Sequence, residues 1–429
     1  MSNVVIVGGV RTAVGSFGGS LKDVPAKDLG ALVIREVLLK NGLTPEVSAP
    51  IRGDSPDTFK DAGLSTVEEK YANWPKDLQK IMVDEVIMGN VLTSGQGQNP
   101  GRQAMIRSGL PKETPAFTIN KVCASGMKAI AVAAATIMAG DNEIVIAGGM
   151  ENMSDVPIAL PKARWGHRMD MPYGQTTDLM VFDGLYEIFY GYHMGITAEN
   201  IAEKYGITRA EQDQMGLDSH NRARAAISSG ILKNEIVPVK IPQKKGDPLV
   251  FDTDERPMDT TLEKMGKLAT VFKKGGTVTA GNASGINDAA AALLLMSESK
   301  AKELGLKPLA RIKGYASGGV DPSYMGLGPI PAVRKLLRIT KTSTKDYGLL
   351  EVNEAFASQA IACLRELNID WSITNVNGSA ISIGHPIGCT GARIVLALAN
   401  EMKRRGVGLG MASLCIGGGM GMAMAIEAV

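Results

Sequence analysis

The sequence predicts an α/β fold made of two similar halves, and two observations lead to this prediction. Apolar runs of strand length, such as "VVIVGG", "EIVIAGG" and "MASLCIGGG", alternate with stretches of helical pattern. The same order of motifs also occurs twice. "DEVIMGNV", "FTINKVCASG" and "EIVIAGGMENMS" in the first half correspond to "GLLEVNEAF", "ITNVNGSAISIGHPIGCTG" and "MASLCIGGGMG" in the second. A repeat of this size indicates a duplicated folding unit.

The pattern of apolar residues predicts the individual helices in chain order. We expect helices over residues 29–40, 127–139, 198–205, 209–228, 355–367 and 392–404. In "STVEEKYANWP", Ser65 and Glu68 form a capping box. The spacing of Val67, Tyr71 and Trp74 places them on one helical face, which predicts a short surface helix.

The alanine-rich segment "TVTAGNASGINDAAAALLL", which starts at Thr277, is expected to end a strand and to open another helix. Asn282, Ala283 and Ser284 are placed to cap that helix. The same backbone groups suit a ligand amide or phosphate.

These elements divide the chain into three parts. Residues 1–153 form the N-terminal half, which continues at 287–307 and carries an inserted surface segment at about 44–80. Residues 154–286 hold few long strand runs and form a loop domain that covers a site. Residues 308–429 form the C-terminal half.

Composition excludes several classes of protein. The 429 residues carry 46 Lys and Arg against 44 Asp and Glu, a balance that indicates no nucleic-acid partner. Four cysteines in a chain of this length fit a reduced compartment better than a disulfide scaffold. No apolar run approaches ~20 residues and "VVIVGG" is too short for a signal peptide, so we expect no membrane partner and a cytoplasmic location.

Cys123 lies in "FTINKVCASGMKAI", where a predicted strand meets a predicted helix. Free N–H groups and the dipole at a helix N-terminus stabilise an anion, so the pKa of this thiol is expected to be lowered. Taken alone, however, a cysteine is more often a small buried apolar residue.

His385 shifts this balance. It lies between Gly384 and Pro386 at a similar joint, which suits a general base, although a histidine that satisfies a loop carbonyl is the alternative. Cys415 is a third candidate, because it lies beside glycines that suit a substrate site. Gly417 and its neighbours in "CIGGGMG" allow backbone N–H groups to approach a substrate oxygen.

Asn353 in "EVNEAFA" either caps a helix or holds a water or a carbonyl. A thiol, a histidine and a second thiol thus each follow a strand beside glycine. Together they indicate one nucleophile and two proton-transfer groups.

At this point the sequence resembles the thiolase family. The blocks "NKVCASGMKA", "GGMENMS", "YGYHMGITAEN", "TVTAGNASGIND", "NEAFA", "NVNGSAISIGHPIG" and "CIGGGMG" are similar to that family's blocks and stand in its order, over nearly the whole chain except 44–80. The resemblance implies a thiolase-like fold in which each half holds a mixed five-stranded sheet. "YGYHMG" and "YMGLGPIPA" are most similar to biosynthetic acetyl-CoA acetyltransferases.

The resemblance implies a role for each of these residues. Cys123 would take an acetyl group from acetyl-CoA, and His385 would take the Cys123 proton. Cys415 would remove a proton from the second acetyl-CoA. Asn353 would hold a water that, with His385, stabilises the enolate. The N–H groups of Cys123 and Gly417 would form a second oxyanion site, a kind of donor typically worth ~2.7–4 kcal/mol.

The resemblance also implies the substrate contacts. Coenzyme A would be a substrate and product carrier, with no permanently bound cofactor and no metal. Its contacts carry over onto Leu185, His193, Met194, Phe272, Ala283 and Ser284. Met325 and Phe356 would line a short acyl pocket and exclude long chains. Ordinary core packing is the alternative for both.

This sequence departs from the family pattern at three places. Ser379 stands where the family usually has glycine, and Cys389 and Thr390 replace a common Ala-Ser pair. The usual basic residue, which would contact adenine or phosphate, is matched only approximately by Arg256.

The activity implied is the reversible condensation of two acetyl-CoA to acetoacetyl-CoA and CoA, in a homotetramer that is a dimer of dimers. A 3-ketoacyl-CoA thiolase of broader chain length and a non-catalytic acyl-CoA binding protein are the alternatives. A cysteine hydrolase fits less well, because it leaves the second thiol without a role.

Overall fold

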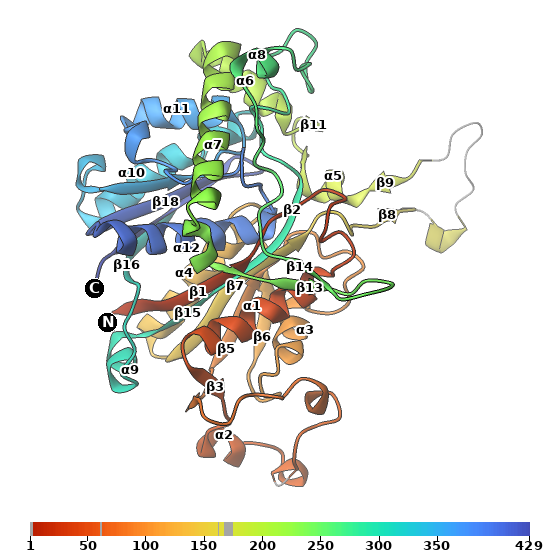
Figure 1. Ribbon diagram of the computed structural model, residues 1–429, viewed down its shortest axis with the longest axis vertical. Coiled ribbons are helices and arrows are strands. Elements are labelled where there is room, and N and C mark those ends of the chain that lie inside the picture. Colours follow the sequence, from red (N-terminus) through yellow and green to blue (C-terminus); the bar gives the residue numbers. More distant parts are fainter. Residues whose placement is uncertain (1–2, 61, 162, 167–174) are drawn as a thin grey trace.

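The computed structural model describes residues 3–60, 62–161, 163–166 and 175–429, and in them the chain forms an α/β fold around one large mixed sheet (Figure 1). The main path of the sheet runs β17-β18-β19-β16-β1-β15-β7-β5-β6. Strands β1 and β16 join its two halves through the pairs Val5–Arg311 and Ile6–Ala310. The predicted α/β class is confirmed.

The N-terminal half contributes the five mixed strands that were expected. In spatial order they are β1 (Val4–Thr12), β15 (Asn287–Ser297), β7 (Ile144–Asn152), β5 (Glu85–Gly89) and β6 (Ala116–Ile119). The pairs β7–β5 and β5–β6 are parallel, whereas β15 runs antiparallel to both of its neighbours.

The C-terminal half repeats this order with one strand reduced. The strands are β16 (Ala310–Gly319), β19 (Met420–Glu427), β18 (Leu409–Ile416) and β17 (Leu349–Val352). In place of the expected fifth strand the described chain has a single bridge between Leu350 and Thr374. The reason is Asn375, whose left-handed backbone ends the strand and whose side-chain amide bonds both the N–H and the C=O of Val352.

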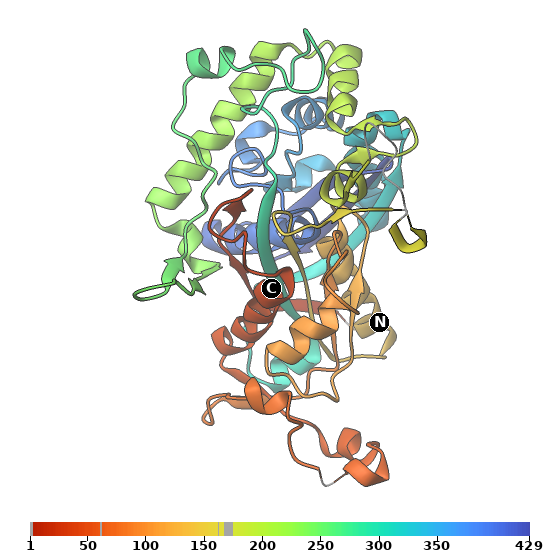
Figure 2. The same ribbon diagram turned by 90° about the vertical axis from the view of Figure 1, so that its right-hand side faces the viewer.

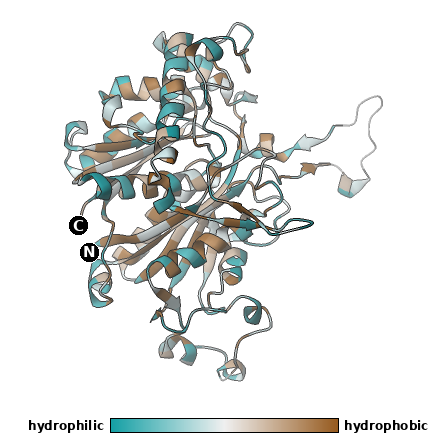
Figure 3. Cartoon of the chain, viewed as in Figure 1, coloured by the Kyte–Doolittle hydropathy of each residue, from teal (hydrophilic) through white to brown (hydrophobic). Residues whose placement is uncertain are grey.

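Helices cover both faces of the two half-sheets, so that five layers result (Figures 1 and 2). The middle layer holds α4 (Ser125–Ala139) and α12 (Ile387–Arg405), packed against strands of both halves. The outer layers are α1 (Ala26–Lys40) with α3 (Pro100–Arg107), and α10 (Pro329–Thr340) with α11 (Ala357–Leu367). Figure 3 shows the hydrophobic strands enclosed between these helices.

All six helices predicted from periodicity exist, with ends shifted by up to five residues. The helix predicted over 209–228 is α7 (Arg209–Ser228), which begins at a Thr208–Glu211 capping box. The one predicted over 198–205 is α6 (Gly195–Tyr205). The largest shift is in α12, which starts at Ile387 rather than 392. Its first turns contain Gly388 and Gly391, which disfavour a helix by propensity but allow close packing against neighbouring backbone.

The alanine-rich segment after Thr277 was wrongly predicted to open a helix. Residues 287–297 form β15, which lies between β1 and β7 and is buried along its whole length. Alanine favours helix by propensity, but a strand that is covered on both faces accepts small residues where helices pack closely against it. Asn282, Ala283 and Ser284 therefore lie in a loop and cap no helix.

Residues 154–286 contain the short strands and helices that extend from the layers. They are β8 (Ile158–Ala159), η3 (Ala163–Trp165), β9 (Thr177–Asp178), α5 (Leu179–Gly184), β10 (Tyr186–Glu187), β11 (Tyr192–His193), α6, α7, η4 (Ile231–Asn234), β12 (Ile236–Val237), β13 (Val239–Ile241), β14 (Leu249–Phe251) and α8 (Leu262–Gly266). Buried Arg11 of β1 fastens this region to the sheet by ion pairs with Glu235 and Asp254.

The surface segment at about 44–80 lies at the lower end of Figure 1, around α2 (Ala49–Gly53). The predicted capping box is present, since Ser65 and Glu68 bond each other's backbone N–H. The predicted short helix is only a 3₁₀ turn, η2 (Glu68–Lys70), and Val67 is 50% exposed. Trp74 instead bonds the Gly109 carbonyl, so the three apolar residues share no buried face.

One segment of the described chain, Val122–Ala139, has the length and hydropathy of a membrane span. It includes α4, and 61% of it is buried inside the protein. A central helix that packs against two half-sheets accounts for this apolar character.

Candidate active site

Cys123 occupies the joint between β6 and α4, two residues before the helix begins. The preceding residue, Val122, has a φ of 46°, which is rare for a β-branched side chain. The Ser125 hydroxyl holds this strained turn, because it donates to the Val122 carbonyl and accepts from the Lys121 N–H. This strain, which fixes the direction of the thiol, could not be predicted from the sequence.

His385 occupies the equivalent joint before α12, again two residues before the helix begins. Its backbone N–H donates to Asn287 of β15 at 2.9 Å, and Gly384 has a φ of 122° beside the same side chain. Glycine is required at 384, because a Cβ would meet the Asn287 amide.

Thr390 sets the protonation of the His385 ring. The Thr390 hydroxyl donates to the Pro386 carbonyl at 2.9 Å and lies 2.7 Å from His385 Nδ1. Because the hydroxyl proton is used, Nδ1 must carry the ring proton and donate it to Thr390. Nε2 is then the free base, and it has no hydrogen-bond partner in the described chain. The sequence showed Thr390 only as a departure from the family pattern.

Glycines bring the two joints together. An added Cβ at Gly126 of α4 would lie 2.7 Å from the Ala392 N of α12 and 3.1 Å from the Gly388 carbonyl. In return, a Cβ at Gly391 would collide with the Met127 backbone. The N-terminal turns of α4 and α12 therefore pack backbone against backbone, which places the Cys123 and His385 joints side by side.

Cys415 and Gly417 lie at the end of β18 and enter the same site. The Gly417 N–H and the Cys123 N–H both stabilise a charge on the Cys123 sulfur. Gly417 packs directly on Met194 and Val122, which leaves no room for a side chain. Burial raises the pKa of the Cys415 thiol well above its usual range, and a charge on Cys123 adds to this rise. The structure thus brings both thiols and the two expected N–H donors together.

The ionisation of the site differs from the expectation for Cys123. Burial raises the pKa of its thiol to about 11, and the two N–H groups offset only part of that rise, so the predicted lowering is wrong for the free enzyme. Burial lowers the pKa of His385 to about 3, and the Arg393 charge adds to this. At neutral pH both the thiol and the imidazole are therefore neutral, and the imidazole is able to accept a proton.

Asn353 follows β17 and is fully buried, and neither atom of its side-chain amide has a partner in the described chain. It does not cap α11, whose N-cap is Phe356. The helix-capping alternative is therefore excluded, and a polar contact with a substrate or a water is the use that the geometry leaves.

Glu151 is a supporting residue that the sequence did not single out. Its carboxylate accepts from the N–H groups of Val91 and Leu92 after β5, and from Gly388 at the start of α12. It thereby ties the His385 loop to the N-terminal sheet, although burial raises its pKa to about 7. The only sequence signal was its place at the end of an apolar strand.

The predicted substrate residues meet at one apolar cluster beside the site. Met194, Ala283, Met325, Phe356 and Cys415 pack together, with Phe272 against them. His193 stacks on Phe272 at 4.6 Å between ring centroids. The Leu185 carbonyl accepts from the Met194 N–H, and the Ser284 N–H donates to Ala355. Residues from the C-terminal half and from 154–286 therefore form one wall.

The structure also places the other positions at which the sequence departs from the family pattern. Arg256 donates to the carbonyls of Ala280, Ala283 and Ile381, so it positions the loop that carries Ala283. Cys389 is fully buried in the core, as expected of a small apolar residue. Ser379 is also fully buried, and its hydroxyl has no partner in the described chain. No set of three or more His, Cys, Asp or Glu side chains suited to a metal ion occurs in the described parts of the chain.

Comparisons with known proteins match this arrangement. The model of the thiolase N-terminal domain matches residues 4–61 and 63–299, and that of the thiolase C-terminal domain matches 306–428. An acetyl-CoA acetyltransferase of Syntrophomonas wolfei is 54% identical over 430 residues, which cover 99% of each chain. One of Cupriavidus necator is 52% identical over 428 residues and all of both chains.

A solved structure has the same fold. The crystal structure of the Bacillus anthracis acetyl-CoA acetyltransferase superposes with a TM-score of 0.89 at 45% identity. The match covers 100% of this chain and 99% of that one.

Proposed function

The chain belongs to the thiolase family and is an acetyl-CoA C-acetyltransferase, and we propose that it acts through an acetyl thioester on Cys123. The reaction joins two acetyl-CoA into acetoacetyl-CoA and releases CoA, and it is reversible. The observation that carries this proposal is the packing of α4 on α12, which puts a thiol and an unpartnered imidazole nitrogen at adjacent helix starts.

In the first step, His385 Nε2 takes the Cys123 proton while the sulfur attacks the acetyl carbonyl. The thiol pKa of about 11 means that thiolate is scarce before substrate arrives, so proton transfer accompanies attack. The N–H groups of Gly417 and Cys123 are the donors for the developing oxyanion. The CoA thiolate leaves with the proton from His385, and the acetyl group remains on sulfur.

In the second step, Cys415 in its thiolate form removes a proton from the methyl carbon of another acetyl-CoA. Because burial raises the pKa of Cys415 well above its usual range, this thiolate is the minor form that reacts. The amide of Asn353, through a water, and His385 are the groups available to stabilise the enolate oxygen. The carbanion attacks the acetyl group on Cys123, the Cys123–acyl bond breaks, and Cys123 recovers a proton from Cys415. Two protons move and none is consumed.

The apolar cluster supports a short acyl chain. Met325 and Phe356 are buried, and Phe272 meets Phe356 edge-to-face at 6.2 Å. A longer chain has to displace these side chains, at the cost of overpacking a filled core. CoA is the carrier on both substrates, and we propose Leu185, His193, Met194, Phe272, Ala283 and Ser284 as its contacts, with residues 154–286 as the domain over it.

We further propose a homotetramer, a cytoplasmic location and a role in fatty acid metabolism. The tetramer is supported by the hairpin β8–β9, which projects from the body (Figure 1) and carries exposed Ile158 and Leu160. A reduced compartment is supported by four free cysteines, none of which pairs with another.

A substrate panel tests the function and the chain length together. Condensation of acetyl-CoA and thiolysis of 3-ketoacyl-CoA from C4 to longer chains are measured, with Cys123→Ala as the control. We expect turnover to be highest with acetoacetyl-CoA. Preference for C8 or longer substrates would assign a broad 3-ketoacyl-CoA thiolase, and binding without turnover would assign a non-catalytic acyl-CoA binder.

A further inference from the structure

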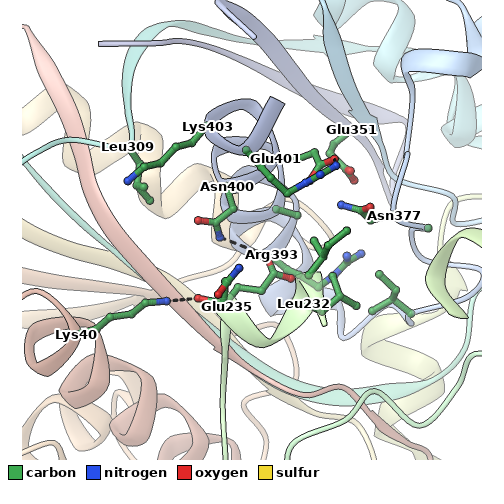
Figure 4. A pocket seen from close by; sticks show the side chains of 16 residues that line it. Lys40, Leu232, Glu235, Leu309, Glu351, Asn377, Arg393, Asn400, Glu401 and Lys403 are labelled. Atoms are coloured by element: carbon green, nitrogen blue, oxygen red, sulfur yellow. Dashed lines mark hydrogen bonds and ion pairs between the residues drawn. The ribbon is translucent and has the colours of Figure 1, made fainter. Parts of the chain in front are cut away.

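A cavity of about 410 Å³ lies along α12 and contains none of the residues placed in the active site (Figure 4). Its walls come from α12, the end of α1, η4, β17 and the loop that carries Asn377. Figure 4 shows Lys40 and Glu235 on one side of this space and Glu351 and Asn377 on the other.

Arg393 lies at the base of this cavity and is 1% exposed. In the described chain its Nε and Nη2 atoms have no hydrogen-bond partner, and it takes part in no ion pair. Burying an unpaired guanidinium is costly, so a charged partner for it is strongly favoured. Nε and Nη2 form one edge of the planar group, the edge that binds two oxygens of a carboxylate or phosphate.

The neighbouring acids do not supply that partner. Glu235 is paired with Arg11 at 2.7 Å, and Glu401 is paired with Arg404 and Arg405. Glu351 is 4% exposed, its Oε2 has no partner in the described chain, and burial raises its pKa well above the usual range. The Arg393 charge offsets part of that rise, but the two side chains form no ion pair in the described chain.

The mouth of the cavity is positive. Lys403 is exposed there, and Lys40 donates to the Asn234 carbonyl. Neither lysine pairs with a carboxylate in the described chain. Cations at the mouth and a free guanidinium edge at the base favour a negatively charged ligand over a cation or a neutral molecule.

We propose that this cavity, the Arg393 site, binds a small oxyanion, either a carboxylate or a phosphate group, through the Nε and Nη2 edge of Arg393. Lys403 and Lys40 attract the anion at the mouth. The Arg393 charge also reaches His385 and lowers its pKa. A bound anion cancels part of that charge, so the Arg393 site is coupled to the active-site base.

Titration of the full-length enzyme with potassium phosphate and with sodium acetate tests this, at constant ionic strength with chloride as the reference anion. Saturating CoA is present to fill any phosphate contact of the substrate site. We expect a saturable rise in the thermal midpoint with at least one oxyanion and none with chloride. A response to acetate alone assigns a carboxylate ligand, and a response to phosphate assigns a phosphate group.

Variants locate the binding. Lys403→Glu is expected to raise Kd about fivefold, because it reverses an exposed charge at the mouth. Lys335→Glu, an exposed change on α10 away from the cavity, is expected to leave Kd unchanged. Arg393→Met is expected to raise Kd by about 100-fold.

If Arg393→Met does not fold, the pair of lysine variants decides. No saturable response in the wild-type enzyme, or equal effects of Lys403→Glu and Lys335→Glu, overturns the proposal. Binding is measured without turnover, so the result does not depend on the acyl-transfer activity.

Discussion

In the N-terminal half the chain enters α4 through Cys123, and in the C-terminal half it enters α12 through His385, each two residues before the helix begins. The first joint is held by a strained Val122 and the Ser125 hydroxyl, the second by Asn287 and Thr390. The position two residues before the helix is therefore present once in each half of the duplicated unit. Cysteine at this position provides a nucleophile, and histidine provides a base. The contact between the two helices makes the pair a single site.

The largest expected effect comes from breaking the N-terminal joint. Cys123→Ala should lower kcat by at least about 10⁴-fold, because no nucleophile remains to carry the acetyl group. Cys389→Ala is the matched control, since Cys389 is a buried core thiol. It should keep nearly full activity in the condensation assay. Equal losses in both variants would contradict the distinction between the two cysteines.

Moving the two joints apart should have the next largest effect, a loss of both stability and activity. Gly391→Ala places a Cβ against the Met127 backbone, so α4 and α12 must move apart. We expect a loss of about 3 kcal/mol in the free energy of unfolding, measured by urea denaturation, together with reduced activity. Gly408→Ala, where a Cβ meets nothing within 4 Å, should change stability by less than about 0.5 kcal/mol.

The two joints also differ in ionisation, which alkylation can measure. The Cys123 pKa is raised to about 11 and that of His385 is lowered to about 3, so the free enzyme holds neutral groups between these values. The rate of Cys123 alkylation by iodoacetamide should rise about tenfold per pH unit from pH 7 to 9, and at pH 7 it should be about 100-fold below that of an ordinary thiol. A plateau below pH 8 would instead indicate a thiolate–imidazolium pair.

The smallest effect should come from loosening the C-terminal joint. Thr390→Val keeps the shape but removes the oxygen that receives the His385 Nδ1 proton. We expect kcat to fall about tenfold with little change in KM, because the free Nε2 is no longer the fixed tautomer. Thr390→Ser should restore kcat. A loss in both variants, or a change confined to KM, would show that Thr390 does not act through His385.

The same contrast shows what could be predicted from the sequence. Cys123, His385 and Cys415 were found because each follows an apolar strand beside glycine in a repeated order. Thr390 and Glu151 were missed, because their roles depend on partners brought near by folding. Residues 287–297 were assigned to a helix because burial on both faces, which overrides alanine's propensity, cannot be read from composition. The Cys123 pKa was misjudged for the same reason, since burial outweighs the helix N-terminus.

Intact-protein mass spectrometry after mixing with acetyl-CoA tests the central claim most directly, with peptide mapping to locate the modification. The account predicts one added mass of about 42 Da, located on Cys123 and absent in Cys123→Ala. It also predicts that the adduct disappears when CoA is added, because the transfer is reversible. Absence of the adduct, or its location on Cys415 or Cys389, would contradict the assignment of Cys123 as the nucleophile.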